Sequence, residues 1–266
     1  MEQPAKPGQI IILNGAPRSG KSSIVKVIQD TFEGVWMNLG VDLFGGHATP
    51  KRYRPGIGLR PGPGPGFGGD APELEPLVPV LFAGVYESIA AHSRLGLNVV
   101  IDIGHHGAIH PGVLGDCARR LAGLPVLFVG IRCPIEEIMK RRKQAGPERG
   151  YVVGTADEPV PPPVLLWQEE VHKPGIYDLE VDTSLLSPEE CAEVIRRRLE
   201  EGPAPSAFQQ LARRSAKQHR RKSMGCRRLR GGRRVALPTL CRGTLRKLHC
   251  CPVSPSSEVS VAASSH

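Results

Sequence analysis

Residues 15–22 carry the residue types that could bind phosphate, in the pattern G-x-x-x-x-G-K-[ST]. The glycines would let backbone N–H groups point at phosphate oxygens, and a helix beginning there would add the positive end of its dipole. Lys21 would reach the β- and γ-phosphates of a nucleotide, and the Ser22 hydroxyl would coordinate Mg²⁺. We therefore predict a nucleotide-binding loop, called the phosphate loop below. The residues expected to bind nucleotide here are Gly15, Ala16, Pro17, Arg18, Ser19, Gly20, Lys21, Ser22 and Ser23.

Two aspartates that follow apolar stretches could act on a bound nucleotide. Asp42 comes after the run 35–41, where a carboxylate could orient an acceptor hydroxyl and take its proton during phosphoryl transfer. Asp102 follows the apolar residues 97–101 and, with Ser22, could hold Mg²⁺ directly or through water. A structural role stays open for each, as a helix cap or solvated carboxylate for Asp42 and as a strand-end cap for Asp102.

Other polar residues near these aspartates could contact substrates. His105 and His106 follow Asp102 and could touch an acceptor, although adjacent loop histidines are more often simply exposed. A basic cluster farther along could supply at least one arginine that neutralises charge on the transferring group from a mobile lid. A solvated helix face explains the same run equally well. The cluster consists of Arg132, Lys140, Arg141, Arg142, Lys143 and Arg149.

Apolar runs and helical spacings alternate along the first two hundred residues. This order indicates right-handed βαβ crossovers, and therefore an α/β domain of three layers with a five-stranded parallel sheet, as in P-loop NTPases. The expected strands are 10–13, 35–41, 97–103, 126–131 and 178–181. The expected helices are 22–28, 77–94, 114–121, 135–143 and 188–199.

Three polar residues fall at the carboxyl ends of expected strands, where parallel sheets bind their ligands: Asn14, Asp42 and Asp102. Two Pro-rich stretches, 55–76 and 147–163, lack the apolar content of core elements and are expected to be loop excursions.

The charge of the chain divides near residue 201. Residues 201–266 hold 14 Lys and Arg against two acidic residues, which leaves 21 basic and 24 acidic residues in positions 1–200. We predict a kinase domain over 1–201 and a disordered basic tail over 202–266. The tail has one aromatic residue, Phe208, so we expect at most weak electrostatic binding of nucleic acid. The sequence has no basic leader and no stretch long enough to span a bilayer, so we expect no membrane partner and a cytoplasmic location.

Several segments together resemble the chloramphenicol phosphotransferase-like family of P-loop kinases, from about Ile10 to Leu199. They are IILNGAPRSGKSSIV from residue 11, NLGVD from 38, NVVIDIGHH from 98, VGIRCP from 129, YDLEVDTS from 177 and SPEECA from 187.

The resemblance implies an adenylate-kinase-like core, ATP as donor, Mg²⁺, and phosphorylation of a small-molecule hydroxyl. Asp42 stands at the position of the aspartate that acts as base. Arg141 or Arg142, together with Arg149, approximate lid arginines; we assign Arg141 and Arg149 to catalysis and Arg142 to the nucleotide. Asp182 and Thr183 lie at the position of the loop that runs beside the adenine in such kinases.

The acceptor is not fixed by these residues. The Pro- and Gly-rich segment 55–69 differs from the founding member of the family, so chloramphenicol is one candidate among antibiotics and other small molecules. A metabolite kinase acting on a sugar acid or nucleoside is an alternative. A regulatory NTPase is another, because residues 42–45 fit D-x-x-G, although the chain has no N-K-x-D motif for guanine.

Overall fold

A computed structural model describes residues 6–50, 76–106, 112–145 and 153–217. Arg149 and most of the stretch 55–76 lie outside these ranges, as does the chain beyond residue 217. No helix within the described ranges combines the length and the apolar character that crossing a bilayer requires.

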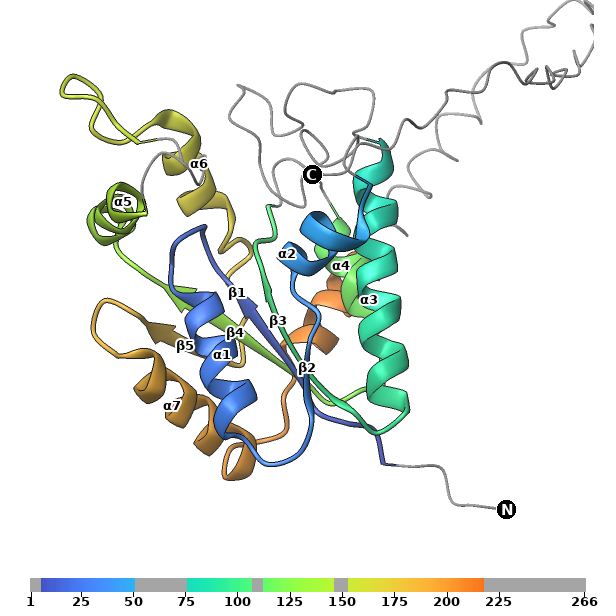
Figure 1. Ribbon diagram of the computed structural model, residues 1–266. Coiled ribbons are helices and arrows are strands. Elements are labelled where there is room, and N and C mark those ends of the chain that lie inside the picture. The colour runs from blue at the N-terminus through green and yellow to red at the C-terminus, as the bar shows by residue number, and fades with distance from the viewer. Residues whose placement is uncertain (1–5, 51–75, 107–111, 146–152, 218–266) are drawn as a thin grey trace, which may run out of the picture. The chain divides into compact units, whose positions relative to one another are not determined.

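Five strands form one sheet in the order β2-β3-β1-β4-β5. All neighbouring strands run parallel, so their carboxyl ends meet at one edge (Figure 1). In the centre, Ile12 of β1 is level with Ile101 of β3 and Phe128 of β4. The predicted five-stranded parallel sheet is confirmed. Its strands are β1 (Ile10–Asn14), β2 (Trp36–Asn38), β3 (Asn98–Ile103), β4 (Val126–Arg132) and β5 (Leu179–Asp182).

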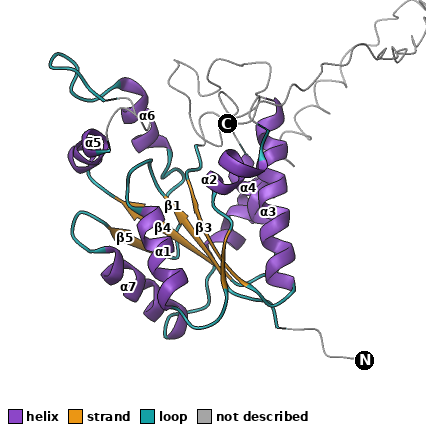
Figure 2. Cartoon of the chain, viewed as in Figure 1, coloured by secondary structure: helices purple, strands orange, loops and turns teal. Residues whose placement is uncertain are grey.

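Helices cover both faces of the sheet, which confirms the three layers (Figure 2). Because successive strand residues point to opposite faces, Ile10 and Ile12 pack with α3 and α4, whereas Ile11 and Leu13 pack with α1 and α7. These helices are α1 (Lys21–Thr31), α3 (Val78–Arg94), α4 (Val113–Arg120) and α7 (Pro188–Glu200).

Two more helices, α5 (Ile135–Gln144) and α6 (Pro162–Glu170), form an arm beside the phosphate loop. Their apolar side chains, Ile138 and Trp167 among them, pack with Ala16 of that loop. From the sequence, residues 147–163 were expected to be a loop excursion, and no helix was expected at the position of α6. The prolines account for the difference, because Pro161 caps α6 and Pro162 opens it, where a missing N–H breaks no helical hydrogen bond.

The second strand is shorter than the expected run 35–41. It ends at Asn38, whose Oδ1 accepts a hydrogen bond from the backbone N–H of Gly40 at 2.9 Å and turns the chain. The short helices α2 (Val41–Leu43) and η1 (Phe44–Ala48) follow directly. Asp42 therefore lies in the first turn of a helix rather than at a strand end.

The packed structure continues beyond the domain end expected near residue 201. Residues 207–217 form a helix, and Ala207, Phe208 and Leu211 are buried in the core with α3 and α4. The Phe208 ring stacks on Tyr86 and meets Phe128 edge-on. This short amphipathic segment is followed directly by an Arg-rich stretch. The composition of the whole region therefore assigned it to the tail. A disordered tail remains a prediction for residues beyond 217.

A single carboxylate joins this helix to the sheet. Asp178 Oδ1 accepts hydrogen bonds from the backbone N–H groups of Ser206 and Ala207 at 2.6 and 2.9 Å. Its Oδ2 accepts one from the N–H of Phe128 at 3.0 Å. The helix start thus receives the oxygen acceptor that helix N-termini require, and β4 shares the same side chain.

Candidate active site

The phosphate loop connects β1 directly to α1, as predicted. Gly20 precedes the helix with φ 92°, and a side chain there would also press against Thr183, so glycine is required twice over. Lys21 folds back onto the loop, and its Nζ donates hydrogen bonds to the carbonyl oxygens of Gly15 and Ala16 at 2.9 and 2.8 Å. Burial lowers the pKa of Lys21 to about 8, although the negative charges of Asp102 and Asp42 act in the opposite direction.

The two expected metal ligands meet at the start of α1. Ser22 donates a hydrogen bond from Oγ to Oδ2 of the buried Asp102 at 2.5 Å. The chain before Asp42 approaches the same carboxylate, since a Cβ at Gly40 would lie 2.1 Å from Asp102 Oδ1. Only glycine permits this approach, which brings the start of α2 to the carboxyl edge of β3.

Asp42 is exposed in the first turn of α2. Its charge acts on Lys21, so the two groups lie within electrostatic reach of each other. The structure therefore brings Lys21, Ser22, Asp102 and Asp42 to one edge of the sheet. A lysine, a hydroxyl and two carboxylates in this arrangement can hold phosphate oxygens, a divalent cation and an incoming hydroxyl.

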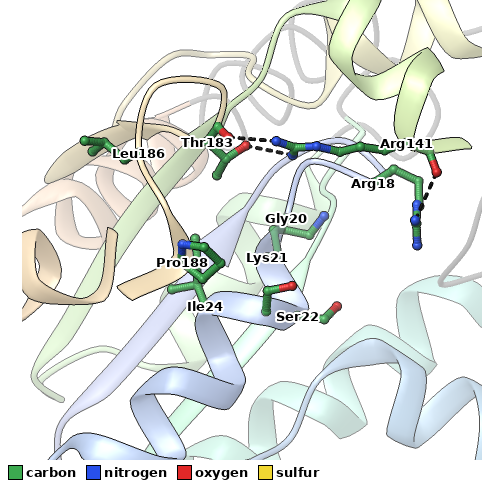
Figure 3. A pocket seen from close by; sticks show the side chains of 10 residues that line it. Arg18, Gly20, Lys21, Ser22, Ile24, Arg141, Thr183, Leu186 and Pro188 are labelled. Carbon is green, nitrogen blue, oxygen red and sulfur yellow. Dashed lines mark hydrogen bonds between the residues drawn. The ribbon is translucent and has the colours of Figure 1, made fainter. Parts of the chain in front are cut away.

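A cavity of about 240 Å³ opens beside the phosphate loop (Figure 3). Arg141 lies along one wall, where its guanidinium donates to Oγ1 and to the carbonyl oxygen of Thr183 at 3.1 and 2.7 Å. Glu137 Oε1 accepts a hydrogen bond from Nε of the same arginine at 3.1 Å. The lining residues are Arg18, Gly20, Lys21, Ser22, Ser23, Ile24, Arg141, Thr183, Leu186 and Pro188.

The two histidines after β3 were expected to be exposed or to touch an acceptor, but His105 is buried and His106 is half-buried. The Nε2 of His105 lies 2.7 Å from the hydroxyl of Tyr86. Burial, with the neighbouring His106, lowers the pKa of His105 to about 3, so it is neutral at physiological pH. His105 serves the packing between α3 and the sheet.

A family model described as chloramphenicol phosphotransferase-like protein matches residues 8–200. The chain belongs to the chloramphenicol phosphotransferase-like family. The resemblance inferred from the sequence is thus confirmed, and the chain is a phosphotransferase of the kinase type.

Relatives of this family member include proteins from two strains of Mycobacterium tuberculosis, CDC 1551 / Oshkosh and ATCC 25618 / H37Rv. The latter carries the name "Putative O-phosphotransferase Rv2636". Each is 27% identical over 221 residues, which are 78% of this chain and 89% of the relative.

Solved structures with a similar course of the chain include the APS kinase of Mycobacterium tuberculosis and the tunicamycin resistance protein of Deinococcus radiodurans. The first is 13% identical, with a TM-score of 0.48, over 73% of this chain and 99% of that one. The second is 16% identical, with a TM-score of 0.48, over 74% and 98%. At these values neither structure informs on the substrate of this chain.

Two residues expected at the nucleotide, Arg142 and Asp182, have other surroundings. Arg142 does not line the cavity: it is 1% exposed, with its guanidinium 5.6 Å from the Trp167 ring centroid. Asp182 Oδ1 accepts hydrogen bonds from the N–H and hydroxyl of Ser184, so it shapes the turn after β5 while its neighbour Thr183 lines the cavity. Arg149 lies outside the described residues.

Sequence reasoning missed the apolar wall and a buried polar network. Leu186, in the turn before α7, and Pro188, the first residue of α7, line the cavity, and nothing in the sequence marks them as ligand-binding. Asn14 was noticed only as a polar residue at a strand end. It makes three hydrogen bonds, to Val171, Tyr177 and His105, whose separation in the sequence no local pattern reveals.

Proposed function

We propose that the chain is an ATP-dependent O-phosphotransferase that moves the γ-phosphoryl group to a hydroxyl of a small molecule. The observation that carries the proposal is the 2.5 Å contact between Ser22 and Asp102 beside Lys21, with Asp42 within electrostatic reach of that lysine. A donor half and an acceptor half of a phosphoryl-transfer site would share the carboxyl edge of the sheet.

The donor half would take the nucleotide along the cavity of Figure 3. The phosphates would lie on the loop amides, where Lys21 would exchange the carbonyls of Gly15 and Ala16 for phosphate oxygens. The nucleobase would lie between the guanidinium of Arg141 and the apolar Pro188, since a planar guanidinium stacks well on rings. This gives Arg141 a role in holding the nucleotide, in place of the catalytic lid role predicted from the sequence.

Mg²⁺ fits the residues at the start of α1. Ser22 and Asp102 offer hard oxygen ligands in direct contact with each other, the ligand type that Mg²⁺ prefers. Ser22 would coordinate the ion directly, and Asp102 directly or through water. When bound, Mg²⁺ supplies charge neutralisation to the β- and γ-phosphates.

Asp42 would act as base. As the acceptor oxygen forms its bond to the γ-phosphorus, the hydroxyl proton passes to the Asp42 carboxylate and ADP leaves with the electrons of the broken bond. Lys21 would stabilise the charge on the transferring group. Arg149 remains a predicted lid arginine.

The acceptor is a small-molecule alcohol, with antibiotics such as chloramphenicol as candidates because of the family and because the mycobacterial relatives are named as O-phosphotransferases. A metabolite kinase is the alternative within the same chemistry. A regulatory NTPase is a further alternative, which predicts nucleotide hydrolysis with no acceptor.

The test is an acceptor screen that follows ADP release, with chloramphenicol, sugar acids and nucleosides included. We expect an acceptor-dependent rate in the wild-type chain and its loss in Asp42→Asn, with nucleotide affinity retained. Transfer at the wild-type rate by Asp42→Asn would overturn the assignment of the base. ADP release that no acceptor increases would favour the regulatory NTPase.

A further inference from the structure

Asn14 joins three separate segments around the site. Its Oδ1 accepts a hydrogen bond from the backbone N–H of His105 at 2.9 Å, and its Nδ2 donates to the carbonyl oxygen of Val171 at 2.7 Å and to the Tyr177 hydroxyl at 2.8 Å. The side chain is 1% exposed. These partners belong to the loop after β3 and to the connection from α6 to β5, while Asn14 itself immediately precedes the phosphate loop.

The partners fix the orientation of this amide. A backbone N–H can only donate and a backbone carbonyl can only accept, so the oxygen of Asn14 must face His105 and the nitrogen must face Val171. An aspartate of the same shape could keep the first hydrogen bond and would lose both bonds that the amide nitrogen donates, leaving only the reverse bond, from the Tyr177 hydroxyl to the carboxylate. The position thus requires an amide rather than any small polar group.

The network extends one step farther, to His172. Because the Tyr177 oxygen accepts from Asn14, its own proton is available for His172 Nδ1, 3.0 Å away. Burial raises the pKa of Tyr177 to about 12, and burial together with the charges of Arg132 and Lys21 lowers the pKa of His172 to about 4. The Tyr177 hydroxyl lies 3.5 Å from the Val171 carbonyl oxygen and 3.0 Å from His172 Nδ1, and when it donates to the nearer acceptor the His172 proton is on Nε2.

The connection from α6 to β5 begins where the arm formed by α5 and α6 ends. Val171 and Trp167 pack with Ala16 of the phosphate loop, and Val171 also lies against Gly104 after β3. Apolar contacts alone would allow α6 to slide on the loop, because such contacts have no directional preference. The two hydrogen bonds donated by Asn14 supply directional contacts at the end of α6, in addition to the one that Gln168 of α6 donates to the Cys133 carbonyl oxygen at 2.7 Å.

We propose that Asn14 is a positioning residue for phosphoryl transfer, whose amide holds the α6–β5 connection and the loop after β3 in fixed register with the phosphate loop. The proposal rests on the proposed function for its kinetic consequence, whereas its structural consequence does not. A small displacement of the donor half of the site against the acceptor half is expected to slow the chemical step strongly without abolishing nucleotide binding.

The experiment compares Asn14→Asp with Asn98→Asp in the full-length chain. Asn98 is a matched control, because its Oδ1 also accepts a backbone N–H, that of Gln9, but at the opposite end of β3. For Asn14→Asp we expect kcat to fall about 100-fold, with a much smaller change in the nucleotide KM. Asn98→Asp should keep both values. Wild-type kcat in Asn14→Asp would overturn the proposal.

Two measurements on the protein alone separate this proposal from the proposed function. In Asn14→Asp, hydrogen exchange of residues 162–177 should speed up, and the ¹⁵N shifts of His172 should report loss of the Nε2–H tautomer as the Tyr177 hydroxyl turns toward the new carboxylate. Both should occur even if no acceptor is ever found. A fall in kcat with unchanged exchange and unchanged ¹⁵N shifts would show that the effect does not pass through this network.

Tyr177→Phe covers the case in which Asn14→Asp does not fold. It keeps the ring against Gly130 and removes only the hydroxyl. We expect the same change at His172 and a smaller loss of kcat, because Val171 keeps its hydrogen bond. Unaltered ¹⁵N shifts of His172 in this variant would overturn the network.

Discussion

The hydroxyl of Ser22 lies 2.5 Å from a carboxylate oxygen of Asp102, although eighty positions separate the two residues in the sequence. Ser22 is the second residue of α1, and Asp102 is the last residue but one of β3. In the proposed function, these two residues would hold the cation that accompanies the nucleotide.

Removing this pair should weaken binding of the Mg²⁺–nucleotide complex. We expect Asp102→Asn to reduce the affinity for Mg²⁺–ATP about 10- to 100-fold, and to change the affinity for ATP in EDTA far less. Calorimetric titration with and without Mg²⁺ measures the difference. Asp30→Asn, an exposed site on the same helix as Ser22, is the control. Equal losses with and without the metal would mean that Asp102 has no part in holding it.

The low pKa of Lys21 predicts a pH dependence. With a pKa of about 8 in the folded chain against 10.5 in the unfolded one, the folded state binds fewer protons between these values. The free energy of unfolding should therefore rise with pH across this window, and Lys21→Met should abolish that rise. Urea denaturation of the nucleotide-free protein between pH 8 and 10 tests it.

The same lysine should take up a proton when nucleotide binds above pH 8, because phosphate charge favours its protonated form. Calorimetry at pH 9 in two buffers of different ionisation enthalpy measures this uptake. Wild type should show it and Lys21→Met should not. Identical heats of binding in both buffers for the wild type would contradict the assignment of Lys21 to the phosphates.

Arg141 should affect the nucleotide more than the chemistry. Since its guanidinium is held against Thr183 on the cavity wall, we expect Arg141→Ala to raise the nucleotide KM about tenfold, equivalent to losing ~1.4 kcal/mol of stacking and charge, and to leave kcat within a small factor. Lys140→Ala, exposed one position earlier, is the control. A large fall in kcat at unchanged KM would restore the catalytic role expected from the sequence.

The helix over residues 207–217 should be part of the folding unit. Phe208→Ala should lower the free energy of unfolding by about 3–5 kcal/mol, because the ring is buried against Tyr86 and Phe128. Gln209→Ala, exposed beside it, should change stability little. Truncation after residue 201 should destabilise the domain, whereas truncation after residue 217 should not. Thermal unfolding of these four variants distinguishes the helix from a dispensable tail.

The fold and the phosphate loop were predictable because both rest on local patterns. An apolar run, a glycine loop and a helical spacing are each visible within fifteen residues. The glycine loop predicted the positions of Lys21 and Ser22, and an apolar run predicted that of Asp102. The helix α6 was not predictable, because the prolines that open it also mark loops. The assignment of Arg142 failed because spacing along α5 places Arg141 and Arg142 on different faces, and burial decides which one lines the cavity.

Asp178 has a consequence for how the chain folds as it leaves the ribosome. Tyr86 of α3 and Phe128 of β4 receive their last aromatic partner from Phe208, in a helix whose first backbone N–H groups, those of Ser206 and Ala207, bond to Asp178. Until that segment emerges, the core beneath α3 and α4 lacks this ring, while the opposite face can already close on α1 and α7. Synthesis would therefore complete the core between the sheet and helices α1 and α7 before the core between the sheet and helices α3 and α4.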